Sequence, residues 1–129
     1  MTGKKSCKIQ VSCKINLSED PSKIKTAVLN VFPELEISLN DQQLIGKSDD
    51  ISSLSNISQS IHTKNTKNTY HRILTKNTKE NSTWFYLNKQ AAFVNTVALC
   101  SESDESPLGP IKVVLETDDI ENTIQTLIC

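Results

Sequence analysis

Glycine and long apolar runs are scarce in this chain, and each shortage excludes a class of protein. With 3 glycines in 129 residues, no glycine-rich phosphate-binding loop fits in the sequence. No apolar run approaches the ~20 residues that a membrane-spanning helix requires. The opening Met-Thr-Gly-Lys-Lys-Ser is not followed by an apolar stretch, which argues against a secretory signal. We therefore expect an intracellular, cytoplasmic protein made of one domain over residues 1–129.

Metal-binding and catalytic motifs are also missing. The cysteines form no Cys-x-x-Cys pair, and His62 and His71 have no ligand spacing to them, so we expect no zinc site. Nor does the chain offer a nucleophile with its base or a spaced pair of carboxylates. We expect a non-enzyme without cofactor or metal. The histidines should be solvated. Three of the cysteines should be small core residues: Cys7, Cys13 and Cys100.

Charge is nearly balanced overall but unevenly distributed. The net charge is −1, which gives no global signal for nucleic acid. Between Asp50 and Glu80 there is no acidic residue, whereas that segment holds Lys64, Lys67, Arg72, Lys76 and Lys79. From Glu102 to Glu121 the balance reverses, and Lys112 is the only base among the acids. These segments predict a basic side and an acidic side of the molecule.

Alternating apolar and polar residues predict strands at 7–15, 34–39, 43–47 and 111–116. Asn40-Asp41 is a turn signal, so the second and third of these strands should form a hairpin with Leu35, Ile37 and Leu39 inward. Gly46 within the hairpin indicates a bulge or a close approach.

Helical spacing of apolar residues predicts four helices. The first starts at Asp20-Pro21 and ends before Pro33, because Asp can cap a helix and Pro suits its first turn. The second follows Asp50, the third covers about 65–74 and precedes a mobile loop to Ser82, and the last follows Asp118 or Asp119. Their apolar stripes are Ile24, Ala27, Val28 and Val31; Ile51, Leu54, Ile57 or Ser58, and Ile61; Tyr70, Ile73 and Leu74; and Ile120, Ile124, Leu127 and Ile128.

The chain is organised around Trp84–Val94, which reads as a central strand followed by a polar corner. Trp84, Tyr86 and Asn88 should face one side of this strand, and Phe85 and Leu87 the other. A short strand at 96–100 and a rigid Pro107–Pro110 segment follow, and we expect that segment to pack against residues 89–93. The predicted class is α+β, in the order β-α-β-β-α-α-β-β-β-α. An antiparallel-rich sheet should contain strands 7–15, 83–88 and 111–116, with helices, including the first and the last, on one face.

Two runs, Tyr86–Phe93 and Ser106–Ile111, resemble a small archaeal family of uncharacterised proteins. The family is described as a predicted RNA-binding domain and possible exosome-associated subunit. Supporting features are Glu19-Asp20-Pro21, Val31-Phe32-Pro33, Leu44-Ile45-Gly46 and an arginine at Arg72. The resemblance implies a fold similar to that of the large-subunit ribosomal protein that binds 5S rRNA, and it implies RNA as the partner, in RNA processing or degradation.

Cations and flat aromatics together suit contact with an RNA backbone and stacking of its bases. We expect weak, largely sequence-independent binding, because a surface of Lys and Asn lacks the bidentate fork of Arg. The candidate RNA-binding residues are Lys8, Lys14, Lys64, Lys67, Arg72, Lys76, Trp84, Tyr86, Lys89 and Gln90.

Three alternatives stay open at this stage. Trp84 and Tyr86 could belong to the core instead of a surface. Arg72 could pair with an acid such as Glu80 and serve the fold alone. A half-open sheet carrying aromatics would also suit a protein interface, so the chain could be a protein-interaction module or a homodimer without RNA.

Overall fold

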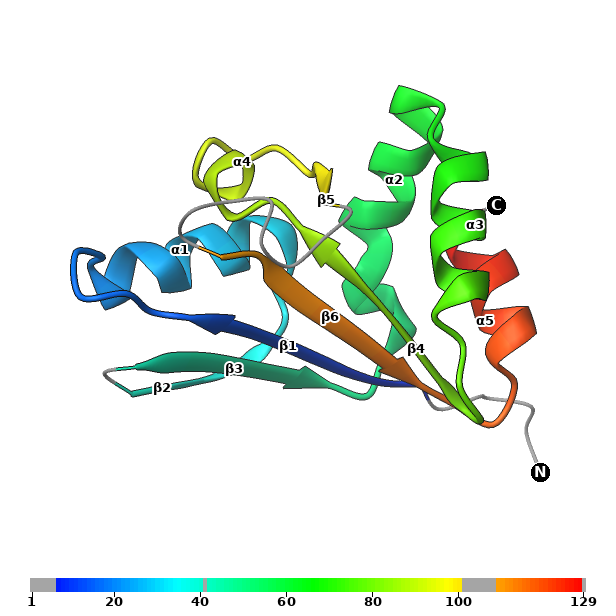
Figure 1. The fold of residues 1–129 in the computed structure, drawn as a ribbon, viewed down its shortest axis with the longest axis horizontal. Helices are drawn as coiled ribbons and strands as arrows, with labels where there is room; N and C mark the ends of the chain where they lie inside the picture. The colour runs from blue at the N-terminus through cyan, green and yellow to red at the C-terminus, as the bar shows by residue number, and fades with distance from the viewer. Residues whose placement is uncertain (1–6, 41, 101–108, 129) are drawn as a thin grey trace.

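The computed structural model describes residues 7–40, 42–100 and 109–128, and these form an antiparallel sheet covered by helices on one face (Figure 1). The predicted α+β class is confirmed. The sheet has six strands in the order β2-β3-β1-β6-β4-β5. The strands are β1 (Lys8–Lys14), β2 (Glu36–Leu39), β3 (Gln43–Ser48), β4 (Ser82–Leu87), β5 (Leu99–Cys100) and β6 (Ile111–Glu116). The helices are α1 (Pro21–Val31), η1 (Ile51–Leu54), α2 (Ser55–Lys64), α3 (Lys67–Lys76), α4 (Lys89–Phe93) and α5 (Ile120–Ile128).

One face of the sheet forms the core. Across the central strands, Val11 lies opposite Val113, and Val113 lies opposite Phe85. All three side chains are fully buried, and the apolar stripes of α1 and α5 belong to the same buried cluster. The first and last helices therefore cover the same face of the sheet, as predicted.

The predicted helix boundaries hold where a cap is present. The Asp20 side chain accepts a hydrogen bond from the Ser22 amide at 3.0 Å, and Pro21 begins α1. The third helix lies two residues later than predicted, at Lys67–Lys76, because Asn65 ends α2 in the left-handed conformation with φ 54°. The loop predicted to continue to Ser82 is shorter: the backbones of Lys79 and Ser82 exchange two hydrogen bonds, which close a tight turn.

The predicted polar corner is a short helix, so the predicted element order lacks α4. Asn88 does not continue the face of Trp84; its side chain accepts a hydrogen bond from the Ala91 amide at 2.9 Å and caps α4. The strand predicted at 96–100 is limited to Leu99–Cys100. Pro107 and Leu108 lie outside the described residues, so the expected packing of Pro107–Pro110 against residues 89–93 stays a prediction.

Gly46 marks a close approach. The β1–β3 and β2–β3 ladders run through it without an extra residue, so no bulge is present. A Cβ at this position would lie 2.8 Å from Leu35 Cδ1 and 3.1 Å from Ile37 Cδ1. Leu35 is buried and Ile37 is partly buried, but Leu39 is 41% exposed at the end of the edge strand, so its inward placement was wrong.

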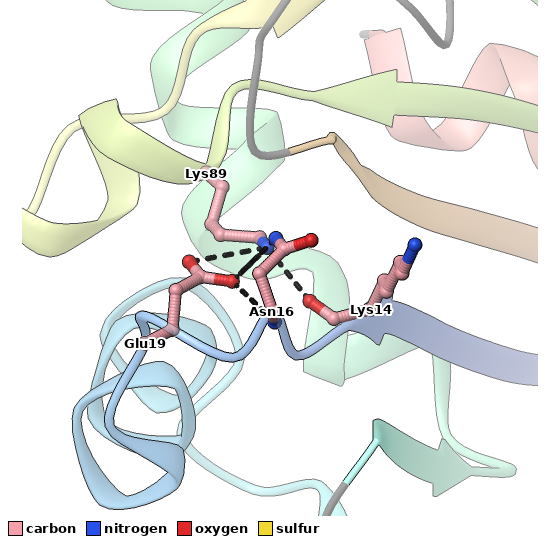
Figure 2. A network of polar contacts seen from close by, with 4 residues as sticks. All are labelled: Lys14, Asn16, Glu19 and Lys89. Carbon is pink, nitrogen blue, oxygen red and sulfur yellow. Dashed lines mark hydrogen bonds and ion pairs between the residues drawn. The ribbon is translucent and has the colours of Figure 1, made fainter.

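A buried lysine joins segments that are far apart in sequence (Figure 2). Lys89 is 0% exposed, and its Nζ donates to the carbonyl oxygen of Lys14 at 2.7 Å. The same Nζ lies 3.2 Å from Glu19 Oε1. That carboxylate oxygen also accepts from the backbone amide and the side-chain amide of Asn16, at 2.9 and 2.7 Å. The end of β1, the loop before α1 and the start of α4 therefore meet at one ion pair.

The pKa of the Glu19 carboxyl is lowered in this environment. Burial raises the pKa of the Glu19 carboxyl, but the hydrogen bonds from Asn16 and the ion pair with Lys89 outweigh it, and the net pKa is below the ordinary value of 4.5. A carboxyl whose pKa is lowered by folding stabilises the protein above its unfolded pKa. That contribution is lost as the pH falls through the folded pKa.

Replacing Gly46 by Ala should destabilise the protein by about 1–3 kcal/mol, the usual cost of overpacking. The cost should fall in a Leu35→Ala background, because the nearest obstructing atom is then absent. Urea unfolding of the two single variants and the double variant measures this coupling. An equal cost of Gly46→Ala in both backgrounds would contradict the close approach.

Replacing Lys89 by Met should lower the free energy of unfolding at pH 7 by about 3–5 kcal/mol, because the Glu19 carboxylate is left without its cation. The double variant with Glu19→Gln should lose less than the sum of the single variants. The difference in stability between wild type and Glu19→Gln should shrink as the pH falls from 4.5 through the lower pKa that Glu19 has in the folded protein.

The matched control is Lys25→Met, which removes an exposed lysine from α1 and should leave the free energy of unfolding nearly unchanged. Urea denaturation at several pH values measures all of these variants. A Lys89→Met protein as stable as the Lys25→Met protein would show that the fold does not need the ion pair.

Candidate nucleic-acid interface

The predicted RNA-binding residues fall on three separate parts of the molecule. One group lies on the face of the sheet that none of the described helices covers, which we call the open face. A second group lies on the helices that cover the other face. The third lies on α4. In that order, the groups are Lys8, Lys14, Trp84 and Tyr86; Lys64, Lys67, Arg72 and Lys76; and Lys89 and Gln90.

Strand order brings the first group together. β6 lies between β1 and β4, and it pairs with both strands along its length. On β4, Phe85 is 0% exposed and Leu87 is 1% exposed in the core, so the alternating Trp84 and Tyr86 face the other way and are half-buried. Their placement on a surface is thus confirmed, and the alternative of a core position was wrong.

Lys112 of β6 completes an aromatic and cationic cluster on the open face. The rings of Trp84 and Tyr86 meet edge to face, with centroids 5.0 Å apart and planes at 60°. Lys112 lies directly opposite Tyr86 in the ladder, and its Nζ lies 5.2 Å from the centroid of the Trp84 ring. We call these three residues the aromatic cluster.

The positive charge of the open face is concentrated at one end. Lys8 lies opposite Glu116, and Lys47 lies opposite Glu36, so each of these cations faces an acid across the sheet. The other two lysines face none in their ladder pairs. Lys112 lies opposite Ser12 and Tyr86, and Lys14 lies opposite Gln43.

A groove of about 750 Å³ lies at this more positive end. Cations, an aromatic ring and neutral hydrogen-bonding groups face it from β1, β3, β4 and β6. We call it the end groove, and its lining includes Ser12, Lys14, Gln43, Tyr86, Pro110 and Lys112.

The second group lies on the opposite side of the sheet. α3 packs on the covered face, where the ring centroids of Tyr70 and Phe85 lie 5.8 Å apart. The Nζ of Lys64 donates to the Val97 carbonyl at 2.7 Å and so ties α2 to the segment before β5. Arg72 is exposed on α3, and within the described part of the chain it makes no ion pair with Glu80 or any other acid.

Acidic residues reduce the basic character of this helical side. α3 packs beside α5, and the cleft between them is lined by Glu80, Asp119 and Glu121 as well as His71. The basic side and the acidic side predicted from the sequence are therefore not separated here, because these acids lie close to the basic helix α3. The helical side is a weaker candidate for phosphate than the end groove.

The third group does not join either surface. Lys89 was wrong as a phosphate contact, because its ammonium is buried against Glu19 and the Lys14 carbonyl. Gln90 is exposed, but α4 packs against α1. Asn88 followed by helix-forming residues was the available signal for this helix.

Lys112 was the main residue that sequence reasoning missed. Its alternation with Ile111 and Val113 already placed it on the polar face of a strand. What the sequence did not show was that β6 lies between β1 and β4, which puts Lys112 beside both aromatics.

Two further kinds of feature concern the described part of the chain: metal-binding groups and membrane-spanning helices. No group of three or more His, Cys, Asp or Glu side chains there is placed to hold a metal ion. None of the described helices is long and apolar enough to span a membrane.

The chain is similar to several proteins of one family. Over 120 residues the chain is 44% identical to a UPF0201 protein of Methanothermobacter thermautotrophicus, covering 93% of this chain and 89% of the relative. A UPF0201 protein of Sulfurisphaera tokodaii is 33% identical over 124 residues, with 93% and 86% covered.

Solved structures agree with the fold described above. The crystal structure of a UPF0201 protein from Methanococcus jannaschii has a TM-score of 0.79 at 26% identity, over 94% of this chain and 92% of that one. A protein from Archaeoglobus fulgidus has a TM-score of 0.75 at 21% identity, over 97% of each chain, which supports the fold alone. Since a family model described as RNA binding matches residues 8–117, and relatives match along most of their length, this chain belongs to that archaeal UPF0201 family.

Proposed function

We propose that this protein binds RNA, without catalysis, through the open face of its sheet. The observation that carries the proposal is the aromatic cluster: two half-buried rings and a lysine on the open face of neighbouring strands. Flat rings stack with bases and cations neutralise phosphates, and both kinds of contact are independent of base identity. The description of the matching family model points to the same partner.

Stacking of a base on Trp84 should be more favourable than the cation–π contact that Lys112 makes with the same ring. A cation–π contact at an exposed site contributes about 0.5–1 kcal/mol. Stacking of a base on an aromatic side chain contributes about 1–3 kcal/mol. A base that stacks on Trp84 therefore repays the displacement of Lys112, whose ammonium is then free to contact phosphate.

The binding is weak and depends on salt. The open face contacts phosphate with lysines, and the chain's only arginine, Arg72, lies on the helical side. A lysine attracts phosphate as a point charge and lacks the bidentate geometry of arginine. Each neutralised phosphate releases counterion, so the affinity falls as the ionic strength rises. A role in RNA processing or degradation, and any contact with an exosome, stay predictions.

Replacing Lys112 by Met should weaken binding of an unstructured RNA and reduce the dependence of log affinity on log salt by about 1, the contribution of one phosphate contact. Trp84 is the chain's only tryptophan, so quenching of its fluorescence measures binding at the cluster itself. The matched control is Arg72→Ala, which removes an exposed cation from the helical side and should leave the affinity nearly unchanged.

The opposite pattern would place RNA on the helical side: a loss of affinity in Arg72→Ala with none in Lys112→Met. If the wild type shows no salt-sensitive RNA binding at low ionic strength, the proposal is wrong. Sedimentation of wild type and Trp84→Ala would then test the open face as a homodimer interface, because the variant should dissociate a dimer that uses this face.

A further inference from the structure

The end groove has the size and the lining of a nucleotide site. Its volume of about 750 Å³ lies within the range of small-molecule pockets, about 300–1,000 Å³. Lys14 and Lys112 supply cations, Tyr86 supplies a flat ring, and Ser12 and Gln43 supply neutral donors and acceptors. Phosphate, base and ribose each require one of these three kinds of group.

The ladder register places these groups within reach of one nucleotide. Tyr86, Lys112 and Ser12 lie directly opposite one another on three adjacent strands, so consecutive Cβ atoms are about 4.5–5.5 Å apart. Lys14 is two residues from Ser12 on the same face, which makes it a diagonal neighbour of Lys112 at about 7–8 Å. Once the Lys112 ammonium leaves the Trp84 ring, the long side chains of both lysines can therefore meet at a single phosphate while Tyr86 contacts the attached base.

Charge favours an anion at this end of the face over the other end. At the other end, Lys8 and Lys47 each lie opposite a glutamate. The ladder partners of Lys14 and Lys112 are neutral residues. Among the described residues, the positive potential of the open face is thus least compensated where the groove lies.

The groove is also held in place before a ligand arrives. The Lys14 carbonyl accepts a hydrogen bond from the buried Lys89, which fixes the end of β1 while the Lys14 side chain stays exposed. A fixed site loses little entropy on binding.

We propose that the end groove binds one unpaired nucleotide of an RNA strand and so makes the protein selective for single-stranded over double-stranded RNA; this rests on the proposed function. The phosphate lies between Lys14 and Lys112, the base stacks on Tyr86, and Gln43 and Ser12 contact the base edge or the ribose 2′-hydroxyl. A duplex cannot make these contacts, because its bases are stacked and paired inside the helix.

The test compares an unstructured single-stranded RNA with a hairpin duplex of the same nucleotide count, measured by Trp84 fluorescence at fixed salt. The wild type should prefer the single strand. Tyr86→Ala should reduce affinity for the single strand about tenfold, as loss of a stacked base requires, and should abolish the preference. Gln43→Ala, a change at an exposed strand position, should reduce the preference without perturbing the fold.

The matched pair is Lys14→Ala and Lys8→Ala, which remove exposed lysines from opposite ends of the same face of β1. Lys14→Ala should lower the preference for the single strand, whereas Lys8→Ala should leave it unchanged. If RNA binds but the groove variants weaken both RNAs equally, the nucleotide site is wrong and RNA binding on the open face stands. If none of them, Tyr86→Ala included, weakens either RNA, then RNA binding on the open face is wrong as well. If neither RNA binds to the wild type, the proposed function fails as well.

Discussion

The structure depends on a sheet whose described helices all lie on one face. Because side chains alternate along each strand, burying Val11, Val113 and Phe85 beneath the helices turns their neighbours toward the other face. A register shift by one residue would exchange the two sets and expose the whole core. The register that hydrophobic burial enforces is therefore also the register that places Trp84 and Tyr86 beside Lys112. Stability and the candidate interface share one cause.

A buried charge adds a second constraint that the apolar core cannot supply. Hydrophobic contacts have no direction, whereas the Lys89 ammonium requires acceptors at specific positions. It finds them at Glu19 and at the Lys14 carbonyl. The arrangement of α4 relative to the end of β1 is thus set by hydrogen-bond geometry. Lys14 also lines the end groove. The backbone of this residue is therefore held by the buried ion pair, while its side chain belongs to the exposed site.

Local patterns predicted local structure well, and failures came where a distant residue decided the outcome. Asp20-Pro21 correctly predicted the start of α1, because a helix cap depends only on residues within one turn of the chain. The sequence suggested Lys89 as a surface cation, because its partner Glu19 is 70 positions away and nothing nearby signals burial. The importance of Lys112 likewise depended on strand order. Alternation fixes which face a residue occupies, but not which strands become neighbours.

The position of β1 in the sheet has a consequence for how the chain folds during synthesis. β1 lies between β3 and β6, and its pairing with β6 joins Lys8 to Glu116. The centre of the sheet thus closes only after nearly all of the described chain has left the ribosome. Until then β1 presents an unpaired edge, which is a site for aggregation. Contacts of such long sequence separation also slow folding, so this edge of β1 stays exposed for longer than an edge that pairs with a neighbouring segment.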